Sequence, residues 1–389
     1  MKKLIAVLLS VFFVSASSLA IELSDSCSVT LLTCSPGEEL YSAFGHTGIR
    51  VTDFKKGIDV VFNYGTFDFD QPGFYTNFLK GEMRYMITVD RFEDFEYMYE
   101  YEKRRVVEQK LNLTLEEKHK IFAFLYWNAK PENREYHYDF FWDNCSTRPR
   151  DVFEKALGEK LQYTYEGFDT NQTMRQTLKP YVAQMPWVDF GFDLILGLPC
   201  EIKATARHQT FLPDKLELLF EHATVNGEPF VTGHDVVVDV PFNPQPFKGV
   251  TPVMVTFVLL LLGIAANVWE RFKNLHWWSF DIVLFFFSGL LGIFFLCMWL
   301  FTTHYSVPKN LNMLWLLPTH LPISLLLLRA KKPAWVQYYF AGTFILMLLL
   351  VVGWKWNPQP YSLAALPLIL LLANRALKIF IRFKQLSLA

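Results

Sequence analysis

The sequence predicts an exported α+β domain followed by an α-helical membrane domain of about five spans. Three features lead to this prediction: a signal-like N-terminus, alternating strand-like and helix-like segments over residues 21–245, and long apolar stretches after residue 250. The chain has 389 residues, of which 52% are hydrophobic and 17% aromatic. A net charge of −1 and the lack of a basic stripe give no reason to expect nucleic acid as a partner.

The N-terminus has the layout of a cleavable secretory signal. Two lysines precede an apolar run from Leu4 to Val14, and small residues stand at Ser18 and Ala20. This pattern predicts cleavage after Ala20, so that residues 1–20 form a signal peptide. An uncleaved anchor is the alternative, although the apolar run is short for a span. Either way, residue 21 begins outside the cytoplasm.

Short β-branched runs and two helix signals organise the exported domain. Thr114 and Glu117 form a capping-box pattern that predicts a helix over 115–129. A second helix begins at or just after Cys145, because Pro149 is tolerated only in a first turn, and it is closed by Gly158. The predicted strands are 49–51, 60–62, 83–89 and 105–113, the first two antiparallel neighbours joined by a turn.

His46 and Cys145 are the candidate catalytic pair of this domain. The start of a helix stabilises a thiolate, so the position of Cys145 predicts a lowered thiol pKa and a nucleophile. His46 begins a strand and shares one face with Gly48 and Arg50, and the nearby glycines leave space beside the imidazole. The alternative for His46 alone is a structural histidine whose hydrogen bonds are satisfied. The alternative for Cys145 alone is a small buried hydrophobic side chain.

Five apolar stretches follow, each about long enough to cross a bilayer. Pro318 and Pro322 interrupt the third, so four spans with a re-entrant third segment is the alternative. With the first domain outside, the inner segments carry nine Lys and Arg residues and the outer loops carry two, Lys309 and Lys355. This predicts a multi-pass membrane protein with its first domain on the exported side and its C-terminus in the cytoplasm. The predicted spans are 251–270, 280–301, 311–329, 335–354 and 362–381.

Polar residues gather on the exported side of these spans. His304, Asn310 and Asn312 fall in the loop before the third span, and His320 falls within it. Because polar side chains at membrane depth are costly, we consider all four as substrate-contacting candidates. The alternatives are a wet loop for His304 and the asparagines, and a helix-to-helix hydrogen bond for His320.

The cysteines allow one bridge in an oxidising compartment. Of Cys27, Cys34 and Cys200, we predict a Cys34–Cys200 disulfide, which leaves Cys145 as a candidate free thiol. A bridged or inert Cys145 is the alternative.

The local motifs resemble two branches of papain-like enzymes. Gly-His-Thr-Gly-Ile-Arg-Val at 45–51, followed by Val-Val-Phe-Asn-Tyr-Gly at 60–65, resembles the histidine strand and next strand of NlpC-type enzymes. An Asn-Cys that opens a helix downstream of the histidine resembles their circularly permuted branch, which includes lecithin:retinol acyltransferase. The resemblance implies a permuted papain-like (NlpC/LRAT-like) α+β fold for the exported domain. It also implies that Asn63, on the strand after His46, orients the imidazole.

The whole chain resembles the bacterial membrane family named for lipoprotein N-acyltransferase activity in the Bacteroides group. The most specific motif is Asp-Asn-Cys-Ser-Thr-Arg-Pro-Arg-Asp at 143–151; Tyr41 to Thr47, Phe211 to Asp214 and Asn310 to Trp315 also fit. The resemblance implies acyl transfer from a phospholipid, through a Cys145 thioester, to the α-amino group of a diacylated lipoprotein. It places the protein among the lipids of the bacterial inner membrane with the first domain in the periplasm, and neither a metal nor a nucleotide cofactor is required.

Other motif residues have candidate supporting roles. Asn144, with backbone N–H groups at the helix start, is a candidate oxyanion donor, and Asp143 a candidate helix cap. Arg148, Arg150 and Arg50 are candidate headgroup ligands, since guanidinium groups suit phosphate. An ion pair of Arg150 with Asp151, or with Glu154, is the structural alternative.

Two other functions fit the sequence less well. A membrane-tethered cysteine peptidase or amidase acting on cell-wall peptide has the same thiol and imidazole but needs only one anchor. A non-catalytic membrane scaffold or sensor would tolerate loss of Cys145.

Overall fold

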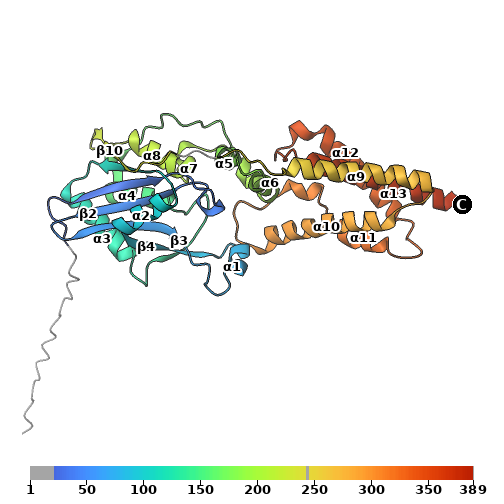
Figure 1. The fold of residues 1–389 in the computed structure, drawn as a ribbon, viewed down its shortest axis with the longest axis horizontal. Coiled ribbons are helices and arrows are strands. Elements are labelled where there is room, and N and C mark those ends of the chain that lie inside the picture. The colour runs from blue at the N-terminus through green and yellow to red at the C-terminus, as the bar shows by residue number, and fades with distance from the viewer. Residues whose placement is uncertain (1–21, 242–244, 389) are drawn as a thin grey trace, which may run out of the picture.

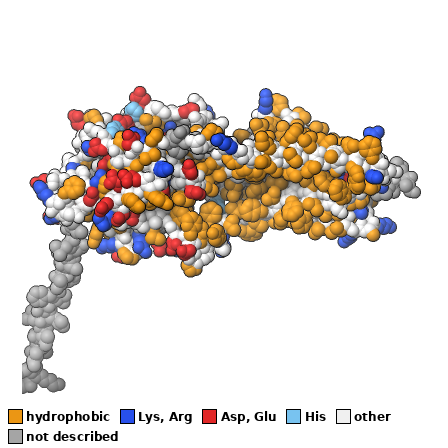
Figure 2. All heavy atoms as spheres, in the orientation of Figure 1, with side chains coloured by type: hydrophobic (Ala, Val, Ile, Leu, Met, Phe, Trp, Pro, Cys, Tyr) orange, Lys and Arg blue, Asp and Glu red, His pale blue; other side chains and the backbone are white. Residues whose placement is uncertain are grey.

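The computed structural model describes residues 22–241 and 245–388, and the predicted signal peptide lies outside them. These residues form an elongated molecule with a mixed α/β domain at one end and a helical domain at the other (Figure 1). Apolar side chains cover the helical domain, whereas charged side chains gather on the α/β domain and at the far end of the helices (Figure 2). This distribution suits a helical domain surrounded by lipid.

A seven-stranded antiparallel sheet forms the centre of the first domain, in the order β10-β5-β1-β2-β3-β4-β6. The four predicted strands are confirmed as β2 to β5, and β2 and β3 are antiparallel neighbours as expected. The strands are β1 (Ser28–Cys34), β2 (His46–Asp53), β3 (Ile58–Thr66), β4 (Arg84–Arg91), β5 (Val106–Leu111), β6 (Glu135–His137) and β10 (Val231–Val238).

The two faces of this sheet are covered differently. One face packs its apolar side chains against α3 (Leu115–Asn128), α4 (Thr147–Leu157) and α8 (Pro213–Glu221), which together form the main core. The other face is covered in part by α2 (Phe92–Tyr101), whose Phe95 and Tyr99 pack on Leu32 and Val61. The part that α2 leaves open includes the start of β2, where His46 stands.

The two helix predictions in this domain are confirmed to within two residues. The Thr114 and Glu117 capping box starts α3, with both of its reciprocal hydrogen bonds present. α4 begins at Thr147 and ends at Leu157, and its C-cap is Gly158, which has a positive φ.

Shorter elements complete the first domain and lead toward the membrane. They are α1 (Phe74–Lys80), α5 (Met174–Val182), α6 (Pro186–Ile195), α7 (Ala206–Gln209), and a small sheet of β7 (Leu161–Gln162), β8 (Thr224–Val225) and β9 (Glu228–Pro229); single 3-10 turns lie at η1 (Leu40–Ser42), η2 (Gly158–Lys160) and η3 (Leu198–Glu201). α1 and α6 lie at the boundary with the helical domain (Figure 1).

The helical domain consists mainly of four long helices. Within the described residues, α9 and α10 are long and apolar enough to cross a membrane, and α12 is apolar but shorter. The last helix, α13, packs against both α12 and α9. The elements are α9 (Pro252–Lys273), α10 (Trp278–Phe301), η4 (Leu311–Leu314), α11 (His320–Leu326), α12 (Val336–Val352), η5 (Trp354–Trp356) and α13 (Ala365–Leu388).

The third predicted span is not a continuous helix. Residues 311–329 form the 3-10 turn η4, an irregular stretch, and the short helix α11. Pro318 and Pro322 lack the backbone N–H that a continuous helix needs, and their rings oppose regular helical packing. This segment packs closely on α10, where Gly289 and Gly292 provide room for its backbone. The continuous third span that the five-span prediction needs is therefore not confirmed.

A buried polar cluster joins three of these helices. The guanidinium of Arg375 on α13 contacts Glu270 on α9 at 2.7 Å and Asp281 on α10 at 2.6 Å. All three side chains are fully buried. Arg375 and Lys378 were counted among the cytoplasmic charges, and the structure places both beside Glu270.

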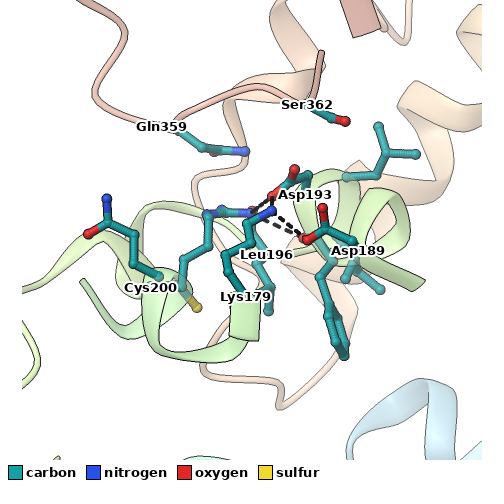
Figure 3. A network of polar contacts seen from close by, with 12 residues as sticks. Lys179, Asp189, Asp193, Leu196, Cys200, Gln359 and Ser362 are labelled. Atoms are coloured by element: carbon teal, nitrogen blue, oxygen red, sulfur yellow. Dashed lines mark hydrogen bonds and ion pairs between the residues drawn. The ribbon is translucent and has the colours of Figure 1, made fainter. Parts of the chain in front are cut away.

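Polar contacts also hold the two domains together. Lys179 on α5 reaches Asp189 at 2.6 Å and Asp193 at 2.8 Å, close to Gln359 and Ser362 of the helical domain (Figure 3). The buried Arg175 bonds Glu201 and the carbonyl of Leu196 in the same region. Across the junction, the α6 carbonyls of Leu194 and Asp193 accept from the Asn310 and Asn312 amides, which fixes α6 against the membrane-side loops.

The predicted Cys34–Cys200 disulfide is wrong for this structure. Both residues are buried free thiols. Cys34 belongs to the cluster under α2, whereas Cys200 belongs to a separate cluster near Leu178 and Phe211. Composition gave the number of available cysteines but not their places in the fold.

Candidate active site

His46 and Asn63 face each other on neighbouring strands. Gly48 of β2 pairs with Asn63 of β3, and His46 Nε2 lies 3.2 Å from Asn63 Oδ1. A Cβ at position 48 would lie 3.2 Å from Asn63 Oδ1 and 2.8 Å from a Val61 methyl group. The glycine at 48 therefore allows Asn63 to approach His46, a more specific role than the open space that the sequence suggested.

Asp90 fixes the orientation of Asn63. Asn63 Nδ2 donates to Asp90 Oδ2 at 2.6 Å, and the Thr88 hydroxyl lies 3.3 Å from the same oxygen. Because a carboxylate only accepts, the amide nitrogen must face Asp90 and the amide oxygen must face His46. Nε2 then carries the imidazole proton, and Nδ1 is the free base. Asp90 was not predicted, although strand alternation would have placed it on this face.

Cys145 lies against the same two strands. Thr47, next to His46, contacts Ser146, next to Cys145, with 2.9 Å between the hydroxyl oxygens. A Cβ at Gly65 would lie 3.2 Å from Cys145 Cβ, and Gly65 has a φ of +92° that disfavours other residues. The start of α4, with Cys145, therefore packs against β2 and β3, the strands that carry His46 and Asn63.

Burial raises the pKa of the Cys145 thiol above its ordinary value. The Thr47 backbone, the Ser146 hydroxyl and the Arg104 charge act in the opposite direction without overcoming burial. The predicted lowering of this pKa is therefore wrong, because removal of water outweighs the helix start. Burial and the Arg104 charge lower the pKa of His46 to about 4, against the Asn63 hydrogen bond. The resting pair is a neutral thiol beside a neutral imidazole.

Asn144 organises the start of α4. Its Oδ1 accepts from the backbone N–H groups of Ser146 and Thr147, each at 2.9 Å. Its Nδ2 donates to the carbonyls of Phe140 and Phe211. Both ends of the amide are occupied, so Asn144 fixes the turn that leads into α4 and has no hydrogen left for an oxyanion. The backbone N–H groups of Thr47 and Cys145 are the donors beside the thiol.

Asp143 and the three candidate headgroup arginines make ion pairs. Asp143 is paired with Arg148 at 2.5 Å and does not cap α4. Arg150 contacts Asp151 at 2.7 Å, Glu154 at 3.9 Å and the Thr210 hydroxyl at 2.7 Å. Arg50 contacts Asp59 and Glu108 and stacks on Phe92. The guanidinium groups of Arg148, Arg150 and Arg50 therefore all have carboxylate partners within the protein.

The polar candidates of the helical domain lie at the junction and among the helices. The Asn310 and Asn312 amides are buried and donate to the α6 carbonyls of Leu194 at 2.6 Å and Asp193 at 2.8 Å. His304 Nε2 lies 3.0 Å from the Phe78 carbonyl, which docks α1 on the end of α10. His320 is buried, with Nδ1 3.0 Å from the Ser288 hydroxyl. None of these contacts involves Cys145 or His46.

Family models match both parts of the chain. The Lnb N-terminal periplasmic domain matches residues 20–179, and the Lnb transmembrane domain matches residues 244–386. The chain belongs to the Lnb-type lipoprotein N-acyltransferase family. As an Lnb-type protein it is a lipoprotein-modifying membrane protein with a periplasmic and a transmembrane domain. No curated protein and no solved structure matches the chain.

Proposed function

We propose that this Lnb-type protein transfers an acyl chain from a phospholipid to the α-amino group of a lipidated N-terminal cysteine. The observation that supports this most directly is the oriented His46–Asn63 pair on β2 and β3, with the start of α4 that carries Cys145 packed against the same two strands. The imidazole leaves Nδ1 free to act as the base, because Asn63 occupies Nε2. A nucleophile beside an oriented base is the arrangement of covalent acyl transfer, as in papain-like enzymes.

In the first half of the reaction, His46 Nδ1 takes the Cys145 proton as the sulfur attacks an ester carbonyl carbon. A carbon–sulfur bond forms, and the carbonyl oxygen becomes an oxyanion next to the Cys145 N–H. The bond to the glycerol oxygen then breaks. That oxygen receives the proton from His46, and a lysophospholipid leaves a thioester on Cys145.

In the second half, the α-amino nitrogen of the lipoprotein attacks the thioester carbon. His46 removes a proton from this nitrogen, the carbon–sulfur bond breaks, and the proton returns to the sulfur. The products are an amide and the free thiol. A neutral resting pair suits this sequence, since His46 must accept a proton in each half and donate it again.

The membrane domain supports a lipid substrate over a soluble one. α1 and α6 dock the catalytic domain onto the periplasmic ends of the helices through His304 and Asn310. Both proposed substrates would be held in the outer leaflet of the inner membrane, with the C-terminus of the protein in the cytoplasm. The cluster of lysines and arginines at the far end of the helices agrees with that orientation (Figure 2).

The test is mass spectrometry of lipoprotein N-terminal peptides from cells that carry wild-type, Cys145→Ala or His46→Ala protein. We expect both variants to accumulate the free-amine form, and trapped wild-type protein to carry an acyl group on Cys145. Fully N-acylated cysteine in both variants would contradict the proposal. A change in cell-wall fragments instead would favour the amidase, and no change in either product would favour the scaffold.

A further inference from the structure

Arg104 is a buried cation with one unused donor. Its side chain is 6% exposed, its Nε donates to the Ser35 carbonyl at 2.9 Å, and its Nη1 contacts Glu102 at 2.8 Å. Nη2 is buried and has no hydrogen-bond partner within the described residues. A buried charged donor without a partner is costly, so such a group indicates a missing ligand.

Arg104 lies beside the catalytic pair. Ser35 directly follows Cys34, and Cys34 pairs with His46 across β1 and β2. The Arg104 charge acts on both the His46 imidazole and the Cys145 thiol. An anion held by Arg104 would therefore be close to the reacting atoms.

Arg104 lines a cavity of about 1360 Å³ whose wall also includes residues close in sequence to the start of α9. Its lining includes Ser42 of η1, Tyr181 of α5, and Phe247 and Lys248 of the segment that leads to α9. The same segment is fixed to α6, because the Trp187 indole donates to the Val250 carbonyl at 2.8 Å. A lipid headgroup rising from the bilayer at the start of α9 would meet this cavity first.

We propose that Arg104 binds the phosphate of the phospholipid acyl donor, with the headgroup in this cavity. The inference rests on the proposed acyl transfer. A guanidinium N–H is a strong donor to a phosphate oxygen, and only a few bonds separate that phosphate from the glycerol ester carbonyl. Binding the phosphate would thus place the carbonyl at Cys145. The carboxylates of Glu38 and Glu39 on the same cavity wall favour a headgroup that also carries an amine.

The experiment measures acylation of Cys145 by intact-protein mass spectrometry, with the full chain in neutral detergent micelles. The donors are phosphatidylethanolamine and a diacylglycerol with the same acyl chains, which lacks the phosphate. The variants are Arg104→Gln, Arg104→Lys and, as matched control, Arg105→Gln. Arg105 is adjacent in sequence but exposed, and its nearest carboxylate is Asp239 at 3.9 Å.

For Arg104→Gln we expect the phosphatidylethanolamine concentration for half-maximal acylation to rise about tenfold or more, the effect of losing a charged hydrogen bond. Acylation by diacylglycerol reports the effect of the Arg104 charge on His46 and Cys145 alone, so the loss with phosphatidylethanolamine should exceed the loss with diacylglycerol by about tenfold. Arg104→Lys should restore part of the affinity, and Arg105→Gln should behave as wild type. Equal loss with both donors, or no loss with either, would overturn the assignment.

A second measurement is independent of turnover. A short-chain phosphatidylethanolamine should slow alkylation of Cys145 by iodoacetamide in wild type and in Arg105→Gln but not in Arg104→Gln. Unprotected alkylation rates report whether the variants are folded. If wild type shows protection without acylation, the proposed function fails while the phosphate site stands. Protection that is equal in all variants would exclude the site.

Discussion

Two sets of buried polar side chains, one in each domain, are satisfied to different degrees. In the membrane domain, Arg375 uses all three of its nitrogens on Glu270, Asp281 and Asn267. In the periplasmic domain, the described residues offer no hydrogen bond to His46 Nδ1 or to Arg104 Nη2. A fully paired set holds helices together, whereas a set with open positions is available to a substrate.

The largest expected effect comes from removing Cys145, the proposed nucleophile of the periplasmic domain. Cys145→Ala should lower acyl transfer by at least about 10³-fold, because no other group can form the thioester. Its effect on unfolding should stay near 1 kcal/mol, since only one small side chain is lost. Activity and thermal unfolding measured on the same preparation check both values. Residual activity above one per cent would require another nucleophile.

Removing Arg375 from its buried ion pairs in the membrane domain should have the opposite effect: stability should fall while activity per folded molecule stays nearly the same. Arg375→Met removes the guanidinium that the buried carboxylates of Glu270 and Asp281 share and leaves only Lys378 beside Glu270 and His276 beside Asp281. We expect a loss of about 3–5 kcal/mol in the free energy of unfolding. Activity per folded molecule should change little. Thermal unfolding in detergent measures the loss.

A matched triple variant separates charge from packing. Arg375→Met combined with Glu270→Gln and Asp281→Asn should recover most of the lost stability, because no unpaired charge remains. If the triple variant is no more stable than Arg375→Met, packing of the arginine and not its charge holds α9, α10 and α13 together.

Asn63→Ala tests whether Asn63 orients the His46 imidazole in the periplasmic domain. It leaves His46 without the acceptor that fixes its tautomer and ring angle, and we expect activity to fall about 10²-fold with little change in stability. Asp90→Asn should have a smaller effect of the same kind, because Asn63 is then free to turn. Equal activity of Asn63→Ala and wild type would remove Asn63 from the site.

The pH dependence of the thiol distinguishes a neutral pair from a preformed ion pair. Burial raises the pKa of Cys145, so its thiolate fraction increases with pH up to and beyond the ordinary thiol value of 9.0. With the pKa of His46 lowered to about 4, no imidazolium stabilises the thiolate at neutral pH. The iodoacetamide rate at Cys145 should therefore climb steadily from pH 6 to pH 9. A plateau across that range would indicate an ion pair.

The sequence predicts elements whose defining residues lie close together in the chain. It misses strand pairings between distant residues. Thr114 and Glu117 lie three residues apart, and the strand holding His46 has its turn and partner directly after it, so local pattern suffices for both. β10 pairs with β5 across more than one hundred residues, and no local signal marks that pairing.

The residues of the candidate site divide in the same way, into those that a local motif marks and those whose role depends on the fold. Cys145 and His46 are recognisable by motif, whereas the role of Arg104 depends on burial and on the fold that places Ser35 beside it. The lowered thiol pKa was expected from the helix start alone, and burial reversed it. Motifs thus single out the proposed reacting groups, while the electrostatic setting of these groups required the structure.

Arg148→Gln should give the smallest effect and sharpen the contrast with Arg104. Arg148 is paired with Asp143 and lies over the Tyr136 ring at 3.5 Å, and its side chain is 25% exposed. A partly exposed ion pair with one ring contact is worth about 1 kcal/mol. We therefore expect a loss of stability of that order and an unchanged phosphatidylethanolamine concentration for half-maximal acylation. A tenfold rise in that concentration would mean that a paired arginine still exchanges its partner for a headgroup, and pairing would no longer separate structural from substrate-binding cations in this domain.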